Sequence, residues 1–257
     1  MTGEGLAEAA RLLAAATRPV VFTGAGMSAE SGVPTFRDAQ TGLWQRYDPA
    51  ELATPAAFRA DPALVWGWYE GRRHGVRRAG PNAGHRAVAA IQARLPETVV
   101  ITQNVDDLHE RGGATAPVRL HGSLFAPRCS ACDHPATPPD DAPEPPAGRL
   151  EPPACARCAA PVRPGVVWFG EALPEAALAA AVEAASRCDL LLTVGTSALV
   201  HPAAEIPLVA ARLGAPVVQV NPVETPLDAV CAVNLRGPAG QVLPALVRAA
   251  WPDVVGR

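Results

Sequence analysis

Four short apolar runs, each followed at once by small or polar residues, constrain the fold of this chain most strongly. They are residues 20–23, 99–102, 190–194 and 217–220. Stretches with helical character lie between them, around residues 83–95, 174–187 and 202–213. Continuous valine-rich runs that alternate with helices predict a parallel sheet covered on both faces. We therefore expect an α/β fold with a Rossmann-like sheet.

The residues that follow these strands predict where a ligand binds. Gly24-Ala25-Gly26 follows the first run, and Gln103-Asn104, Gly195-Thr196-Ser197 and Asn221 follow the others. In an open parallel sheet, ligands bind beyond the carboxyl ends of the strands. A strand, a glycine turn and then a helix also open a nucleotide-binding unit, whose helix N-terminus suits a phosphate. The sequence thus predicts one crevice at this edge.

Two stretches interrupt the alternation and divide the chain. Residues 44–78 are rich in aromatic residues and predict a helical insertion, and residues 127–164 are proline-rich with little apolar periodicity. We expect the Rossmann-like domain to be built from residues 1–43, 79–126 and 165–257, with a small inserted module at 127–164.

The inserted module contains two Cys-x-x-Cys pairs. They are Cys129 with Cys132 and Cys155 with Cys158. This spacing predicts a four-cysteine zinc site, and a segment without its own core would depend on the metal to fold. All four positions would be filled by protein, so the zinc would be structural. Two disulfides, four free thiols or a nucleic-acid contact are the alternatives.

Charge and hydropathy exclude several classes of protein. The net charge is -3, and all 22 basic residues are arginine. A nucleic-acid binder would show a basic field. No apolar run approaches the length of about 20 residues that a membrane span needs. The N-terminus shows no secretory signal, so we expect a cytoplasmic protein that binds neither membrane nor nucleic acid.

The residues after the glycine turn resemble a known family. The stretch Gly24–Asp38, the motif Thr102–His109, the pair His121-Gly122, the two cysteine pairs, the segment Val166–Glu171 and Gly195-Thr196-Ser197 follow in order. Together they resemble the sirtuins, the NAD-dependent protein lysine deacylases, over about residues 6–250. The bacterial class III members, which remove succinyl and malonyl groups, are most similar.

The resemblance implies a set of NAD-binding residues. They are Gly24, Ala25, Gly26, Ser28, Ala29, Glu30, Thr35, Phe36, Arg37, Trp44, Gln103, Asn104, Val105, Asp106, Gly195, Thr196, Ser197, Asn221, Glu224 and Ala239. Asn104 and Asp106 would hold the nicotinamide carboxamide and ribose. Two departures concern this set: Asp38 replaces a small residue, and Glu224 stands one position later than usual after Asn221.

His121 is the catalytic residue that the resemblance implies. In this family the acyl oxygen of the substrate lysine attacks the nicotinamide ribose and expels nicotinamide. The histidine then takes a proton from a ribose hydroxyl, which suits an imidazole with a pKa near neutrality. The products are nicotinamide, O-acyl-ADP-ribose and free lysine.

The substrate side is also implied by the resemblance. The residues are Ala53, Tyr69, Arg72, Val167, Phe169, Gly170 and Glu171. Tyr69 and Arg72 are three residues apart, so on a helix they share a face and can bind a carboxylate at the end of an acyl chain. The strand Val166–Phe169 would pair with an extended substrate peptide.

We therefore expect a monomeric NAD-dependent deacylase acting on acyl-lysine proteins or peptides, with acetyl and succinyl or malonyl groups as substrates. Two alternatives use the same crevice. One is a mono-ADP-ribosyltransferase, and the other is a sensor that binds NAD or ADP-ribose without turnover. His121, Asn104 and Asp106 together count against the sensor, because binding alone needs no base.

Overall fold

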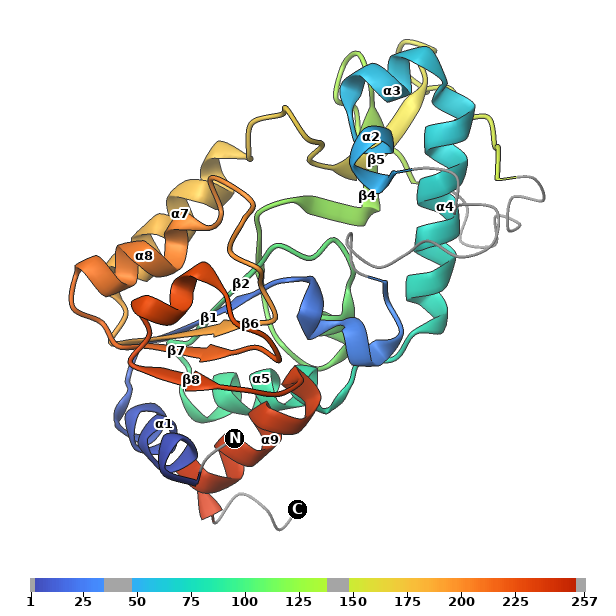
Figure 1. Cartoon of the computed structure of the whole chain (residues 1–257). Coiled ribbons are helices and arrows are strands. Elements are labelled where there is room, and N and C mark those ends of the chain that lie inside the picture. The colour runs from blue at the N-terminus through green and yellow to red at the C-terminus, as the bar shows by residue number, and fades with distance from the viewer. Residues whose placement is uncertain (1–2, 35–47, 138–147, 253–257) are drawn as a thin grey trace.

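The computed structural model describes residues 3–34, 48–137 and 148–252 (Figure 1). Within them lies a sheet of six parallel strands with the order β3-β2-β1-β6-β7-β8. The strands are β1 (Pro19–Thr23), β2 (Val99–Thr102), β3 (Val118–Arg119), β6 (Leu190–Val194), β7 (Val217–Val220) and β8 (Val233–Leu235). The predicted Rossmann-like sheet is confirmed. The strands β3 and β8 are not among the four predicted apolar runs, because they have only two and three residues.

Helices cover both faces of this sheet (Figure 1). One face packs against α1 (Gly3–Ala15), α5 (Ala83–Arg94) and α9 (Ala239–Ala250), and the other against α7 (Glu175–Arg187) and α8 (Glu205–Arg212). Neighbouring residues of a strand enter opposite cores, as Val21 and Phe22 do. Burial on both faces explains why the strands are continuous apolar runs.

The order of the strands reverses between β1 and β6, which are neighbours although they are far apart in the sequence. Val21 lies beside Val100 of β2 and beside Leu192 of β6. Such a switch point opens a crevice at the carboxyl ends of the two strands. The turns after Thr23 and Val194 therefore face one another there.

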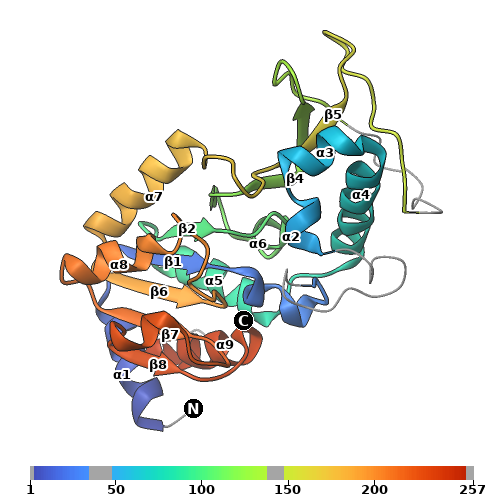
Figure 2. The same cartoon turned by 45° about the horizontal axis from the view of Figure 1, so that its top comes forward.

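A smaller part lies to one side of the sheet (Figure 2). It contains α2 (Pro49–Leu52), α3 (Pro55–Ala60), α4 (Pro62–Arg78) and the antiparallel pair β4 (Gly122–Cys129) and β5 (Val162–Val166). Asp48, Thr54 and Asp61 each cap one of these helices, and proline follows each cap. A capping side chain before proline favours helix initiation, so the sequence itself sets these starts.

The glycine turn after β1 departs from expectation. No α-helix follows it within residues 24–34; instead there are two 3-10 turns, Ala25–Met27 and Ala29–Ser31. Gly32 ends the second turn in the left-handed conformation, with φ at 79°. The predicted helix is therefore wrong in this stretch, because a glycine and the nearby Pro34 interrupt it.

The remaining short helix is α6 (Leu108–Arg111), which follows the motif after β2. Among the described residues, no helix is long and apolar enough to cross a membrane.

Candidate active site

The crevice at the switch point is built from backbone packed on backbone. Gly24 N–H donates to the carbonyl of Val194 at 2.9 Å, and Gly26 N–H donates to that of Gly195 at 2.8 Å. Gly195 has a φ of 60°, and a Cβ there would lie 2.4 Å from Met27 N. Glycine is required at this position for both reasons.

These contacts also use backbone N–H groups of the stretch where a phosphate was predicted to bind. The N–H groups of Gly24, Gly26, Met27 and Ser28 all donate to backbone carbonyls. A phosphate would therefore have to be bound by other hydrogen-bond donors of the crevice. The contact of this turn with NAD stays a prediction.

Beside the turn, three predicted NAD-binding side chains form one buried network. Ser28 Oγ donates to Asp106 Oδ2 at 2.9 Å and accepts from Asn104 Nδ2 at 3.2 Å. Asp106 Oδ1 accepts from Leu108 N–H at 3.0 Å. Burial raises the pKa of the Asp106 carboxyl, and these donors oppose the rise. The turns after β1 and β2 thus bring these side chains together.

Two further histidines, neither of them among the predicted site residues, extend this network. His85 Nε2 lies 3.4 Å from Ser28 Oγ, and His109 Nε2 lies 2.9 Å from Thr23 Oγ1. Burial lowers the pKa of His85 to about 4 and that of His109 to about 3, so both are neutral at pH 7. The signal for His85 was its place three residues after Asn82, the cap of α5.

Arg119 is a further residue that sequence reasoning missed. Its Nη1 donates to the carbonyls of Asp106 at 2.7 Å and Asn104 at 3.4 Å. Its Nε and Nη2 donate to Glu110 Oε1 at 3.1 and 2.6 Å. Arg119 therefore ties the turn that carries Asn104 and Asp106 to the end of β3, two residues before His121. One arginine among many gave no signal for this role.

His121 is half-buried and has a defined orientation. Its Nδ1 lies 2.9 Å from the carbonyl oxygen of Gln103. A carbonyl only accepts hydrogen bonds, so Nδ1 carries the proton and Nε2 keeps a lone pair. Burial lowers the pKa of the imidazole, and the bond to Gln103 opposes this. The ring is thus a neutral base whose free nitrogen is Nε2.

The segments that follow β2, β6 and β7 meet at Thr196. Gln103 Nε2 donates to Thr196 Oγ1 at 3.0 Å, and Asn221 Nδ2 donates to the Thr196 carbonyl at 2.7 Å. The adjacent Ser197 is half-buried, whereas Glu224 is exposed on the loop after β7. The predicted residues Gln103, Thr196 and Asn221 therefore converge.

Glu30 has a structural contact of its own. Its Oε2 accepts from the N–H of Gly240 at 2.5 Å, in the first turn of α9 beside the buried Ala239. A carboxylate there stabilises the helix N-terminus. Four predicted NAD-binding residues, Thr35, Phe36, Arg37 and Trp44, lie outside the described residues, as does Asp38.

Two of the predicted acyl-binding residues, Ala53 and Tyr69, lie in one apolar cluster. Trp168 is buried in the same cluster, and Val105, a predicted NAD-binding residue, packs against it. Arg72 follows Tyr69 by one helical turn, with its Cζ 5.2 Å from the ring centroid of Trp68. Burial lowers the pKa of Arg72, and the nearby Tyr69 and Asp106 oppose this. Arg72 therefore lies near both the predicted acyl pocket and the predicted nicotinamide pocket.

Of the predicted substrate-pairing strand, Val166–Phe169, only Val166 lies in a regular strand, because β5 spans Val162–Val166. Beyond it, Val167 N–H donates to the carbonyl of His121 at 2.9 Å, and Phe169 N–H donates to that of Ala53 at 2.9 Å. Phe169 itself is 46% exposed. The chain then turns at Gly170, where φ is 86°.

Glu171, also predicted to meet the substrate, is held by the protein. Its Oε1 and Oε2 accept from Arg163 at 2.6 and 2.9 Å, and Oε2 also accepts from Trp168 N–H at 2.8 Å. A hollow of about 410 Å³ lies beside it, lined by Gly122, Arg128, Gly165, Val166, Val167, Glu171, Ala172 and Pro174.

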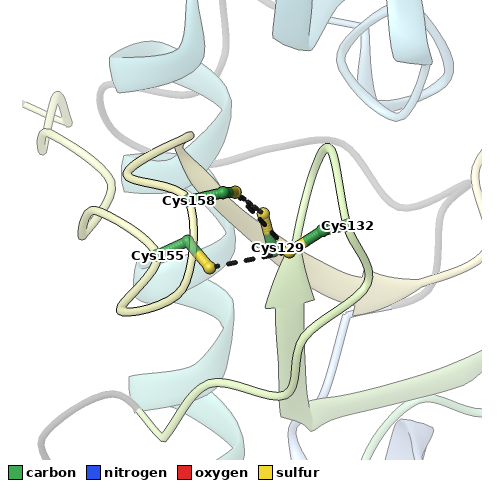
Figure 3. Close-up of side chains that lie close together, drawn as sticks. All are labelled: Cys129, Cys132, Cys155 and Cys158. Atoms are coloured by element: carbon green, nitrogen blue, oxygen red, sulfur yellow. Dashed lines mark hydrogen bonds between the residues drawn. The ribbon is translucent and has the colours of Figure 1, made fainter.

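The four cysteines converge as the zinc prediction requires (Figure 3). Their Sγ atoms all lie within 4.8 Å of one another, with separations of 3.4, 3.5 and 3.8 Å among them. Zinc–thiolate bonds of about 2.3 Å in a tetrahedron place sulfurs about 3.8 Å apart. All four cysteines are free, so the disulfide alternative does not describe this structure. The residues fit a zinc ion.

Each cysteine pair forms the same kind of turn. Ala131 N–H donates to Cys129 Sγ at 3.4 Å, and Arg157 N–H donates to Cys155 Sγ at 3.3 Å. The residue after each second cysteine has a positive φ, 54° at Asp133 and 60° at Ala159. Two such turns facing one another explain the tetrahedral set.

Comparison with known proteins gives consistent results. Residues 24–202 match the Sir2 family. An NAD-dependent protein deacylase of Methylococcus capsulatus is 62% identical over 231 residues, which cover 89% of this chain and 91% of that protein. A crystal structure of a Sir2 homologue in complex with NAD is 45% identical, with a TM-score of 0.87, and covers 95% of this chain and 93% of the other. A Sir2 protein bound to a myristoylated histone peptide is 32% identical, with a TM-score of 0.76 and 97% coverage of both chains.

Proposed function

The chain belongs to the Sir2 family, and we propose that it is an NAD-dependent protein lysine deacylase that removes acetyl groups and also succinyl or malonyl groups. The observation that carries the proposal is the neutral His121, whose Nδ1 is bound to Gln103. A sensor would need no such base at the mouth of the crevice. The proposal includes a monomeric enzyme that acts on acylated proteins in the cytoplasm.

His121 is the general base of this proposal. When bound, NAD would supply the ribose carbon that the acyl oxygen of the substrate lysine attacks, with nicotinamide as the leaving group. His121 Nε2 would take the proton from the ribose hydroxyl that attacks the acyl carbon, and addition of water would release the lysine amine. The Gln103 carbonyl keeps Nδ1 protonated, so the ring accepts this proton only at Nε2.

Other residues of the chain position the reactants. Asn104 and Asp106 would bind the nicotinamide side of NAD, and Arg119 fixes the turn that carries them. Gln103, Thr196 and Asn221 would bind the phosphate and ribose groups beside Gly195. The four cysteines would hold zinc, which stabilises the small module and offers no open position for catalysis.

A His121→Asn variant tests the base. We expect it to bind NAD and zinc normally but to lose at least about 100-fold in kcat/KM for acyl-lysine peptides. Nicotinamide and O-acyl-ADP-ribose are measured by chromatography. Undiminished O-acyl-ADP-ribose formation would overturn the mechanism.

The pH profile of the wild type gives a second test. The pKa of His121 is lowered below its ordinary value of 6.5, and the neutral form is the active base. We therefore expect kcat/KM to stay high at pH 6.5 and to fall as the pH drops further, through the lowered pKa. A loss of activity that begins above pH 7 would contradict this assignment.

An Arg72→Met variant tests the acyl preference. If Arg72 binds the acyl carboxylate, we expect desuccinylation to fall about 10-fold or more relative to deacetylation, because a charged hydrogen bond is lost. Measurement of both rates on the same peptide sequence decides this. An equal fall on both substrates would contradict the carboxylate clamp.

A further inference from the structure

We propose that Trp168 is a positioning residue for acyl specificity, acting through the hydroxyl of Tyr69. This inference rests on the proposed removal of acyl groups that end in a carboxylate. It concerns a residue whose side chain has no predicted contact with the substrate or with NAD. The hydrogen bond between the two side chains carries it.

The direction of this hydrogen bond is fixed by chemistry. Trp168 Nε1 lies 3.1 Å from the Tyr69 hydroxyl, and each residue is 3% exposed. An indole N–H can only donate, so the hydroxyl oxygen of Tyr69 is the acceptor. The single proton of the phenol is then directed away from the indole. It remains available for another acceptor, such as the carboxylate of an acyl chain.

The environment keeps that proton in place. Burial strongly raises the pKa of the Tyr69 phenol, and the charge of Arg72 opposes this only in part. The phenol therefore stays protonated across the pH range of the reaction. A neutral donor next to a guanidinium suits a carboxylate better than a phenolate would, because it adds no negative charge.

Trp168 is itself held from several sides, so its N–H has a defined direction. The Arg163 guanidinium lies 3.5 Å from its ring centroid, and the ring of Phe58 lies 5.3 Å away. Its backbone N–H donates to Glu171, whose carboxylate is bound by Arg163. These contacts fix the indole between a charged pair and an aromatic ring.

The segment that carries Trp168 also contacts the rest of the site. The residue before it, Val167, donates to the carbonyl of His121, and the residue after it, Phe169, donates to that of Ala53. One short segment thus connects the base, the apolar cluster and Tyr69. The position of the Tyr69 hydroxyl is set relative to the base through these contacts.

The test is Trp168→Phe, which removes the N–H but keeps an aromatic ring. We expect kcat/KM for a succinyl-lysine peptide to fall about 5- to 10-fold relative to the acetyl-lysine peptide, as the loss of one buried hydrogen bond predicts. Both rates are measured on the same preparation, so the ratio does not depend on the folded fraction. Trp66→Phe is the matched control, since Trp66 is equally buried and lies in α4 beside Tyr69.

Tyr69→Phe and the double variant complete the design. Tyr69→Phe should lower the same ratio, and adding Trp168→Phe should lower it little further, because both changes remove one function. An unchanged ratio in either single variant overturns the inference, and so does an additive loss in the double variant. If the wild type does not remove succinyl groups at all, the proposed acyl preference fails instead.

Discussion

The crevice edge of the parallel sheet and the small part formed by α2–α4, β4 and β5 both carry predicted site residues but are held together differently. At the sheet edge, backbone contacts backbone: Gly24 and Gly26 pack on Gly195. In the small part, single side chains join distant segments, as Arg149 does by binding Asp61 at 2.6 and 2.7 Å. We therefore expect the first region to tolerate changes of surface side chains but not a side chain added at one of these glycines. We expect the second region to depend on particular side chains.

Loss of the metal should have the largest effect. Cys155→Ser removes one thiolate, and structural zinc sites supply on the order of 10 kcal/mol of folding free energy. We expect the module to lose its zinc and deacylation to fall at least about 100-fold, while ADP-ribose binding persists because the sheet has its own cores. Zinc content, calorimetric binding and deacylation are measured together.

Cys231→Ser is the control for this change, since Cys231 is half-buried far from the cluster in the sequence and contributes no ligand to it. Equal losses of ADP-ribose binding and deacylation in Cys155→Ser would show that the two regions fold as one unit. That result would contradict the distinction between the two regions.

Gly195→Ala, which changes the crevice edge of the sheet, should have the next largest effect. A Cβ at this position meets Met27 N at 2.4 Å, in addition to the strain of a φ of 60°. Left-handed strain costs about 1 to 2 kcal/mol and overpacking about 1 to 3 kcal/mol more. We expect the melting temperature to fall and ADP-ribose affinity to drop at least about 10-fold.

Gly214→Ala separates strain from crowding. Gly214 also has a positive φ, 88°, but nothing lies within 4 Å of its added Cβ. This variant should lose stability through strain alone and keep its ADP-ribose affinity. If both variants lose affinity equally, close packing at Gly195 does not position the crevice.

The same contrast explains what the sequence could predict. The strands and the convergence of their ends followed from valine-rich runs, because burial on both faces requires a continuous apolar segment. The contacts of Arg119, His85 and His109 left no pattern in the sequence, since each depends on one pairing between separate segments. The cysteine cluster was predictable because metal ligands have a fixed spacing.

On the acyl side, the resemblance named Tyr69 but gave no sign of its bond to Trp168. Glu171 was assigned to the substrate because a motif shows which residue is present but not whether its charge is already bound. Single tertiary contacts of this kind cannot be derived from periodicity.

Arg119→Met should have a moderate effect that reports on the sheet edge. Without the guanidinium, the carbonyls of Asn104 and Asp106 lose a charged donor, at a cost of about 1.5 to 3 kcal/mol for such hydrogen bonds. We expect the KM for NAD to rise about 10-fold, with little change in the KM for the acyl peptide. The exposed Arg94→Met is the control. A rise in the peptide KM alone would contradict this role.

The smallest effects should come from two alanines with positive φ, Ala159 at 60° in the second cysteine turn and Ala198 at 56° beside Thr196. Glycine at either position relieves left-handed strain but increases the entropy of the unfolded chain, for a net gain of about 0.5 to 1 kcal/mol. Because metal binding and folding of the module are coupled, Ala159→Gly should raise zinc affinity about 2- to 5-fold and leave ADP-ribose affinity unchanged.

Ala198→Gly should leave zinc affinity unchanged, because Ala198 lies in the crevice, where its N–H donates to Thr196 Oγ1 at 3.2 Å. Relief of strain there should instead raise the melting temperature of the sheet. Competition with a chelator measures the first quantity and thermal unfolding the second. A change of zinc affinity in Ala198→Gly would mean that strain at the sheet edge reaches the metal site, and the two regions would then share one folding equilibrium.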